Sequence, residues 1–326
     1  MTGCLSGIVS SIVFSPAEAP ILSGPVRARG RPDTLGHFHT IAHKFKGFRD
    51  RRGYGLSLDC GIPSQKDLTV RKRLLHCCAP LLGLTCVSAA HAENTYLFSL
   101  ATGVTSRYEG SRDYRPIVGP AFAAQFGNGF FISTTDGAGY RKDFANGLFV
   151  SAALSYDDGR ADENRFDRPG SDYLKGMGNI PGSLLVSVQA GAHLFGSSTI
   201  SVTLDQPLTH TTRGISGHVD LTVPVLQTPT NDISITGSLH AGSGRYTQTF
   251  FGVTDAQAAA SRFQSYSTKG GFDHATISAA WNYTFSPRWS LNTSAGLTRL
   301  VGSSSNSPIV QTKNNWFATT AVTYRY

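Results

Sequence analysis

The sequence predicts an all-β protein, a transmembrane antiparallel β-barrel of about 12 strands. The first observation is a long alternation over 275–285, where every second residue is apolar or aromatic and those between are mostly small or polar. Strands of soluble proteins are usually about 5 to 6 residues long. A tilted strand that crosses a bilayer needs roughly 9 to 11 residues, and this segment is long enough to cross.

The second observation is the end of the chain. A turn at Ser286-Pro287-Arg288 is followed by a second alternating segment, and a third covers 316–326 and ends on the aromatic Tyr326. Aromatic residues such as Trp281 and Tyr324 lie near the ends of the apolar faces, where the interfacial girdles of membrane barrels occur. This ending is typical of the terminal strand of a bacterial outer-membrane barrel, and it disfavours a large soluble sandwich, the alternative for an alternating chain.

Alternation also predicts the two faces of each strand. We expect Ile277 to face lipid and Ser278 to face the lumen, because consecutive side chains of a strand point in opposite directions.

Composition is the third observation. Charged residues make up 15% of the chain and hydrophobic residues 40%, which is too little for a bundle of membrane helices but suits strands that are polar at every second position. The net charge of +8 is concentrated in residues 1–92, which hold 12 Lys and Arg against 5 Asp and Glu, whereas residues 93–326 hold 17 against 16. A nucleic-acid-binding face needs clustered positive charge, so we expect no nucleic-acid partner.

The N-terminal part of the chain differs from the rest. Residues 1–69 show no sustained strand-like or helix-like periodicity of apolar residues, and we interpret them as a misassigned or disordered extension. A genuine basic extension is the alternative. Residues 70–92 resemble a secretory signal peptide, with a basic start at Arg71, Lys72 and Arg73, an apolar stretch, and Ala90-His91-Ala92 as the cleavage motif. The mature barrel is then expected to cover 93–326. All five cysteines precede residue 93, so the barrel needs no disulfides.

The strands expected from alternation are joined by connections of two kinds. One set is short, and the other includes the three longest connections, 159–181, 243–269 and 302–313, as expected for periplasmic turns and outer loops. The expected strands cover 95–108, 114–127, 129–136, 138–144, 147–158, 182–195, 198–208, 214–226, 231–242, 270–285, 288–301 and 314–326. The third and fourth have the weakest alternation.

Four segments carry a family resemblance: YEGSRDYR at 108–115, LSYDDGR at 154–160, YTQTFFGVTDAQAAAS at 246–261 and RLVGSSSNSPIV at 299–310. From Tyr96 to Tyr326 the chain resembles the MipA/OmpV family of outer-membrane proteins, named for an MltA-interacting protein. The chain departs from the family at Ser304 or Ser305, where the family often has an acidic residue. The resemblance marks as motif residues of the loops Tyr108, Gly110, Ser111, Gly159, Arg160, Ser307 and Pro308.

The resemblance implies a function and a place. It implies a non-enzymatic scaffold in the outer membrane of a Gram-negative bacterium, embedded in the lipid bilayer, that anchors a murein transglycosylase and a murein synthase. Partners in the periplasm would meet the short turns, where Asp232 and Arg288 are the candidate contacts. A small porin and an adhesin are the alternatives.

Other polar residues carry weaker signals. His193, His218 and His240, with Asp205 and Asp220, fall on inward faces, where we interpret them as lumen residues rather than as an esterase-like site. The acidic loop at 157–163 could attract a divalent cation weakly, but solvated charge is the simpler interpretation. We therefore predict no catalytic, cofactor-binding or metal-binding residues, and an enzyme carried on the barrel is a third hypothesis. Residues 256–260 are expected to form a short helix capped by Thr254 or Asp255.

Overall fold

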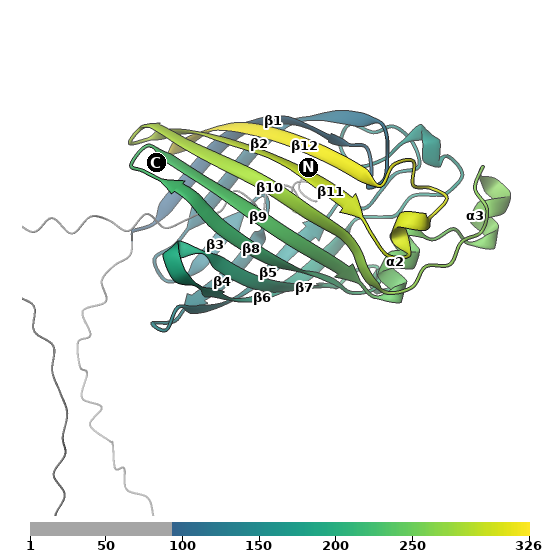
Figure 1. Cartoon of the computed structure of the whole chain (residues 1–326), viewed down its shortest axis with the longest axis horizontal. Helices are drawn as coiled ribbons and strands as arrows, with labels where there is room; N and C mark the ends of the chain where they lie inside the picture. The colour runs from purple at the N-terminus through teal and green to yellow at the C-terminus, as the bar shows by residue number, and fades with distance from the viewer. Residues whose placement is uncertain (1–92) are drawn as a thin grey trace, which may run out of the picture. The chain divides into compact units, whose positions relative to one another are not determined.

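Twelve antiparallel strands close into one barrel, as the alternation predicts. The computed structural model describes residues 93–326, so the predicted extension at 1–69 and the predicted signal peptide at 70–92 lie outside the described residues. Figure 1 shows the short turns gathered at one end of the barrel, together with the C-terminus, and the long loops with α2 and α3 at the other. The strands are β1 (Thr95–Ser106), β2 (Tyr114–Gln125), β3 (Phe130–Ser133), β4 (Gly137–Asp143), β5 (Leu148–Asp157), β6 (Ser183–His193), β7 (Thr199–Pro207), β8 (Ser216–Gln227), β9 (Asn231–Gly242), β10 (Gly271–Ser286), β11 (Trp289–Leu300) and β12 (Asn314–Arg325).

The barrel closes between its first and last strands. β1 pairs with β12 from Leu97 opposite Arg325 to Val104 opposite Ala318, so the sheet has no free outer edge at its ends. The side chain of Ser99 lies 2.8 Å from that of Thr323 across this seam.

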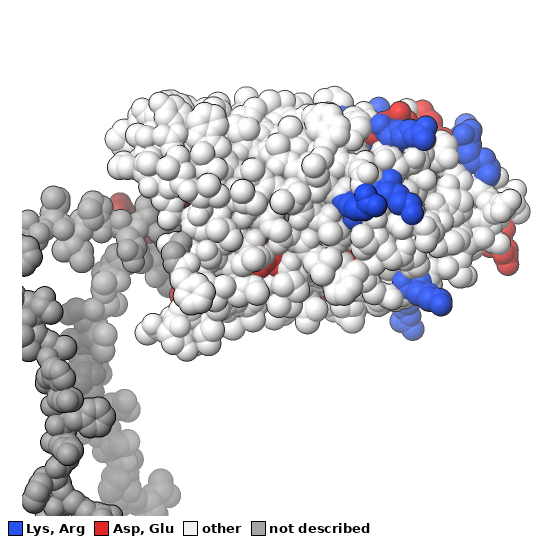
Figure 2. Space-filling model, viewed as in Figure 1, with Lys and Arg blue, Asp and Glu red and all other residues white. Residues whose placement is uncertain are grey.

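The two faces of the wall differ as predicted. Ile277 is 58% exposed on the outer face, whereas Ser278 is 5% exposed inside. Inward hydroxyl groups bond across strands, as between Ser294 and Thr319 at 2.7 Å. In the view of Figure 2, charged side chains gather over the long-loop end, and the wall is almost free of them. This is the distribution expected for a wall in contact with lipid.

The hairpin of β3 and β4 is shorter than expected. The sequence predicts strands at 129–136 and 138–144, but β3 has 4 residues and β4 has 7. β3 reaches β2 only at Ala123–Gln125, which leaves the part of β2 nearer the loops paired with β1 alone.

Two prolines explain how β2 accommodates this gap. The N–H of Phe122 donates to the hydroxyl of Thr134, on the side of β2 that faces β3. Pro116 and Pro120 lie an even number of residues from Phe122, so their backbone nitrogens are directed to the same side. Proline has no N–H, so two donors that would point into the unpaired side are absent. The loop 158–182 contacts this part of β2, where Arg115 donates to the carbonyl of Phe166 at 3.1 Å.

Short helices form in the loops. α2 (Gly244–Phe251) and α3 (Asp255–Ala260) lie between β9 and β10. The predicted cap of the second is confirmed as Thr254, which forms a capping box with Gln257. None of the helices in 93–326 is long and apolar enough to span a membrane. Single 3-10 turns occur at Asp172–Leu174, Phe195–Ser197, Thr211–Arg213 and Ser304–Asn306.

Candidate functional site

The long loops fold together into a small hydrophobic core at their end of the barrel. Its members come from four different connections between strands: 107–113, 158–182, 243–270 and 301–313. We call these buried side chains the loop core: Tyr108, Leu174, Met177, Val253, Phe263 and Ile309. Three of the four segments that carry the family resemblance contribute to it.

The motif at 108–111 joins the first loop to the last. The hydroxyl of Tyr108 donates to the carbonyl of Ile309 at 2.7 Å. Gly110 has a φ of +95° and its N–H donates to Asn315 at 2.8 Å. The amide of Asn315 in turn donates to the carbonyl of Ser111 at 2.7 Å. This tight turn favours glycine because its φ lies in the left-handed region, where a residue with a side chain is strained, and an added Cβ would also lie 3.0 Å from Val310.

Gly159 and Arg160 fasten the base of the loop 158–182. Gly159 has a φ of +70°, and an added Cβ would lie 2.1 Å from the carbonyl oxygen of Ile180. Arg160 exchanges two backbone hydrogen bonds with Ile180, at 2.9 and 2.7 Å. The buried guanidinium of Arg160 donates to the carbonyl of Phe250 in α2, and burial lowers its pKa to about 10.

Ser307 and Pro308 shape the last loop. The buried hydroxyl of Ser307 donates to the carbonyl of Phe251 at the end of α2, and Pro308 is half-buried beside Ile309. Ser304 and Ser305, where the family resemblance predicts an acidic residue, are both buried. Among the motif residues, Tyr108, Arg160 and Ser307 thus form hydrogen bonds that join different loops.

The acidic loop residues at 157–163 do not converge on one point. Asp157 pairs with the guanidinium of Arg213, Asp162 accepts from the N–H groups of Gly176 and Gly178, and Glu163 pairs with Arg165 at 3.3 Å. Each of these carboxylates is bound by a separate donor group, which suits loop structure better than cation binding.

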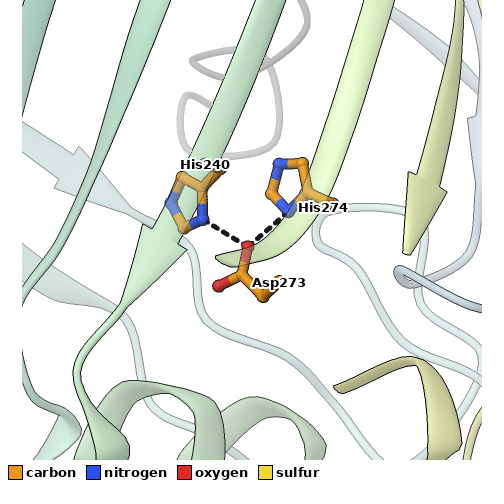
Figure 3. A group of neighbouring side chains, drawn as sticks. All are labelled: His240, Asp273 and His274. Atoms are coloured by element: carbon orange, nitrogen blue, oxygen red, sulfur yellow. Dashed lines mark hydrogen bonds and ion pairs between the residues drawn. The ribbon is translucent and has the colours of Figure 1, made fainter. Parts of the chain in front are cut away.

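A polar cluster lies on the inner wall where β8, β9 and β10 reach the loops. His218, His240 and His274 are in register on the three strands, and the rings of His240 and His274 stack with centroids 4.5 Å apart. The Oδ1 atom of Asp273 lies 2.6 Å from Nδ1 of His240 and 2.9 Å from Nδ1 of His274. Figure 3 shows both rings directed at the same carboxylate oxygen.

A β-bulge creates this arrangement. On β10, Phe272 pairs with Ala241 and His274 with His240, so Asp273 has no partner of its own. A bulge lets two consecutive side chains face the same side of a sheet. Asp273 is therefore 0% exposed, although strict alternation from His274 would place it on the outer wall.

Asp273 and His274 are not among the candidate residues that the sequence indicates. His218 and His240 lie inside the barrel, as the alternation predicts, but no metal-like spacing is visible in the sequence. The three potential metal ligands His240, Asp273 and His274 come together within the described residues. His193, by contrast, lies near the short turns, with its Nε2 3.9 Å from Asp143. Asp205 accepts a hydrogen bond from Ser187.

The two candidate partner contacts lie at the short-turn end, in different settings. Arg288 is exposed in the turn between β10 and β11. Asp232 is half-buried at the start of β9 and has the same parity as the buried Thr236, so it faces the lumen. Arg288 is thus the more accessible of the two to a partner.

Comparison with known proteins finds relatives that are outer membrane proteins. Outer membrane protein Omp26La of Vibrio anguillarum is 25% identical over 161 residues, which cover 49% of this chain and 61% of that protein. Outer membrane protein OmpV of Vibrio cholerae serotype O1 is 24% identical over the same extent. The match thus spans about three fifths of the length of these relatives. Among solved structures, the translocator domain of the autotransporter NalP from Neisseria meningitidis matches with a TM-score of 0.37 and 10% identity, over 73% of this chain and 91% of that one.

A family model decides the assignment. The model described as MltA-interacting protein MipA matches residues 98–326, which include nearly the whole barrel, all the long loops and the four motif segments. This chain therefore belongs to the MipA family and is a β-barrel protein of the outer membrane.

Proposed function

We propose that this protein anchors murein-remodelling enzymes, a murein transglycosylase and a murein synthase, at the periplasmic side of the outer membrane. Membership of a family described by its interaction with MltA carries this proposal. In outer-membrane barrels the long loops face the outside of the cell and the short turns face the periplasm, so the enzymes would meet the short turns of this barrel.

The architecture supports an anchor more than a wide channel. Four outer loops pack into the loop core, so part of the outer mouth is filled by protein. The lumen is lined by hydroxyl groups that bond to one another, such as Thr222 to Thr236 at 2.9 Å. Among the inward residues of 93–326, no ring of one charge sign, which would favour a selective filter, is found.

The partner surface would be small. The connections at the periplasmic end are 126–129, 144–147, 194–198, 228–230 and 287–288. So few side chains would bury less than the roughly 1,200 to 2,000 Å² of a standard interface. A partner that is itself held at the membrane has a high effective concentration, which compensates for weak contacts.

Capture of MltA by the purified full chain in lipid nanodiscs tests the proposal. The variant Arg288→Glu reverses the charge at the exposed periplasmic turn and is expected to weaken capture at least about tenfold, as loss of a well-placed charged contact does. Arg112→Glu makes the same charge change in an exposed outer loop and is expected to leave capture unchanged. Asp232→Asn is expected to have a smaller effect than Arg288→Glu, because Asp232 faces the lumen.

Planar-bilayer conductance separates the anchor from the porin. The anchor predicts small conductance together with measurable capture. Large, steady channels from a barrel that retains no murein enzyme would replace the anchor by the porin, and equal capture by Arg288→Glu and Arg112→Glu would remove the periplasmic turn from the interface.

A further inference from the structure

We propose that His240, Asp273 and His274 form a binding site for a divalent transition metal ion, Zn²⁺ or a similar ion, on the inner wall of the barrel beneath the outer loops. The proposal does not depend on the anchoring function. It rests on the bulge at Asp273, which places a carboxylate between two imidazole groups of neighbouring strands (Figure 3).

The ligand chemistry fits such an ion. Two imidazole nitrogens and one carboxylate oxygen are ligands that Zn²⁺ accepts in sites that keep a fourth position for water. Oδ1 of Asp273 lies 2.6 and 2.9 Å from the two Nδ1 atoms. Ligand atoms around tetrahedral Zn²⁺ are about 3.3 Å apart, given bonds of about 2.0 to 2.1 Å. Oδ1 of Asp273 therefore needs to move apart from the two Nδ1 atoms by about 0.7 and 0.4 Å, respectively.

One ring must also turn. The rings of His240 and His274 are within 10° of parallel, and an ion bound to both nitrogens lies near the plane of each ring. The terminal torsion of histidine is broad, so one ring can turn at little cost. Ion binding is thus expected to break the stack between these two rings.

Two buried atoms of the cluster lack good hydrogen bonds among the described residues. Oδ2 of Asp273 has no partner, and Nδ1 of His274 lies close to Oδ1 of Asp273 without an aligned hydrogen bond. Buried polar groups without partners are rare in folded proteins. A cation bound to Nδ1 of His274 and to both carboxylate oxygens of Asp273 would give each of these two atoms a partner.

Two further carboxylates lie around the three proposed ligands. Oε2 of Glu109, in the first outer loop, lies 3.7 Å from Nδ1 of His274, and Glu109 could supply a fourth ligand. Its side chain is 47% exposed, whereas that of His274 is 16% exposed. Tyr246 of α2 packs on His240 with centroids 5.4 Å apart and shields it on that side. Asp220, beside His218 at 3.3 Å, provides a further carboxylate nearby. These carboxylates favour a divalent cation over an anion at the same place.

Zn²⁺ titration of the purified full chain in detergent, followed by calorimetry, tests the site. We expect one Zn²⁺ per chain that is lost or weakened more than about tenfold in His240→Ala and in His274→Ala, since loss of even an outer-shell partner of a metal site costs about 10- to 100-fold in affinity. Co²⁺ in place of Zn²⁺ gives a visible spectrum that reports four-coordinate nitrogen and oxygen ligation. Histidines and cysteines in 1–92 are present in every variant, so their binding cancels in the comparison.

Two histidine variants serve as matched controls. His218→Ala removes the third histidine of the row, and His193→Ala removes one near the opposite end; both are expected to retain the ion. Heat-modifiable mobility on gels verifies the folded barrel, and His274→Gln replaces any variant that does not fold. Equal binding by all variants, or no binding beyond that of a chain in which both His240 and His274 are replaced, overturns the proposal.

Discussion

The hydroxyl of Tyr108 donates a hydrogen bond to the carbonyl of Ile309 at 2.7 Å, across 201 positions of sequence. This bond joins the first outer loop to the last, and both residues belong to the loop core. The loops are thus held by tertiary contacts of their own, in addition to the strands that carry them.

Ile309→Ala is expected to open the loop core. Ile309 is fully buried, and removing such a side chain typically costs about 2 to 5 kcal/mol. Because the loss falls on the loops, proteolysis of the outer loops in intact liposomes should become faster while the heat-modifiable gel shift of the barrel is kept. Phe166→Ala is the control, since Phe166 is 56% exposed in the loop 158–182; equal proteolysis of both variants would contradict the buried loop core.

Alkaline pH is expected to loosen the same loops. Burial raises the pKa of Tyr108 above its usual value near 10, with a smaller contribution from Tyr173, and burial likewise raises the pKa of Tyr246. Both tyrosines stay neutral in the packed loops at a pH where unpacked tyrosines ionise. Their contribution to loop stability is therefore complete below about pH 10 and is lost as the pH rises beyond it.

Ultraviolet titration of tyrosine checks this expectation. Tyr108 and Tyr246 should ionise late, and Tyr108→Phe should remove one late step but leave that of Tyr246. Simultaneous ionisation of all tyrosines near pH 10 in the folded barrel would contradict it.

Gly159→Ala is expected to disorder the base of the loop 158–182. Alanine there meets the carbonyl oxygen of Ile180 at 2.1 Å in addition to an unfavourable φ of +70°. Gly178→Ala is the matched control, because Gly178 has a φ of +76° but nothing within 4 Å of an added Cβ. The control carries only the backbone cost of about 1 to 2 kcal/mol. Hydrogen exchange of the N–H groups of Arg160 and Ile180 should rise much more in Gly159→Ala than in Gly178→Ala, and the reverse order would refute the steric argument.

Ile277→Arg is expected to destabilise the barrel in lipid by about 2 to 4 kcal/mol, the cost of arginine near the bilayer midplane. Phe285 lies on the same outer face of β10 but near the periplasmic turn, where the cost falls to about 0 to 1 kcal/mol. Reversible urea unfolding in vesicles measures both, and equal losses for Ile277→Arg and Phe285→Arg would show that Ile277 does not lie near the midplane.

Much of the barrel wall could be predicted from the sequence because the two environments of a strand, lipid and lumen, appear as an alternation of apolar and polar residues along the chain. A residue such as Ile277 meets lipid and its neighbour Ser278 meets the lumen, and this difference recurs at every second position. The alternation of short turns with long loops then determines the number of strands and their direction. The weak pattern at 129–144 corresponds to β3 and β4, which are too short to span the full height of the wall.

The loop core and the polar cluster could not be predicted from the alternation, because both depend on contacts or register that form only in the folded sheet. Tyr108 and Ile309 meet only after the barrel has closed and brought distant loops together. The periodicity of apolar residues along the sequence does not predict such a contact. Asp273 was missed for a related reason: a bulge adds one residue to a strand, shifts the alternation and turns a side chain inward. The sequence by itself determined the barrel, its faces and its family, because these depend on repeated local patterns and on matching motifs. Only the tertiary structure decided which loops meet and which two histidine rings contact one carboxylate oxygen of Asp273, because closure and register are properties of the whole sheet.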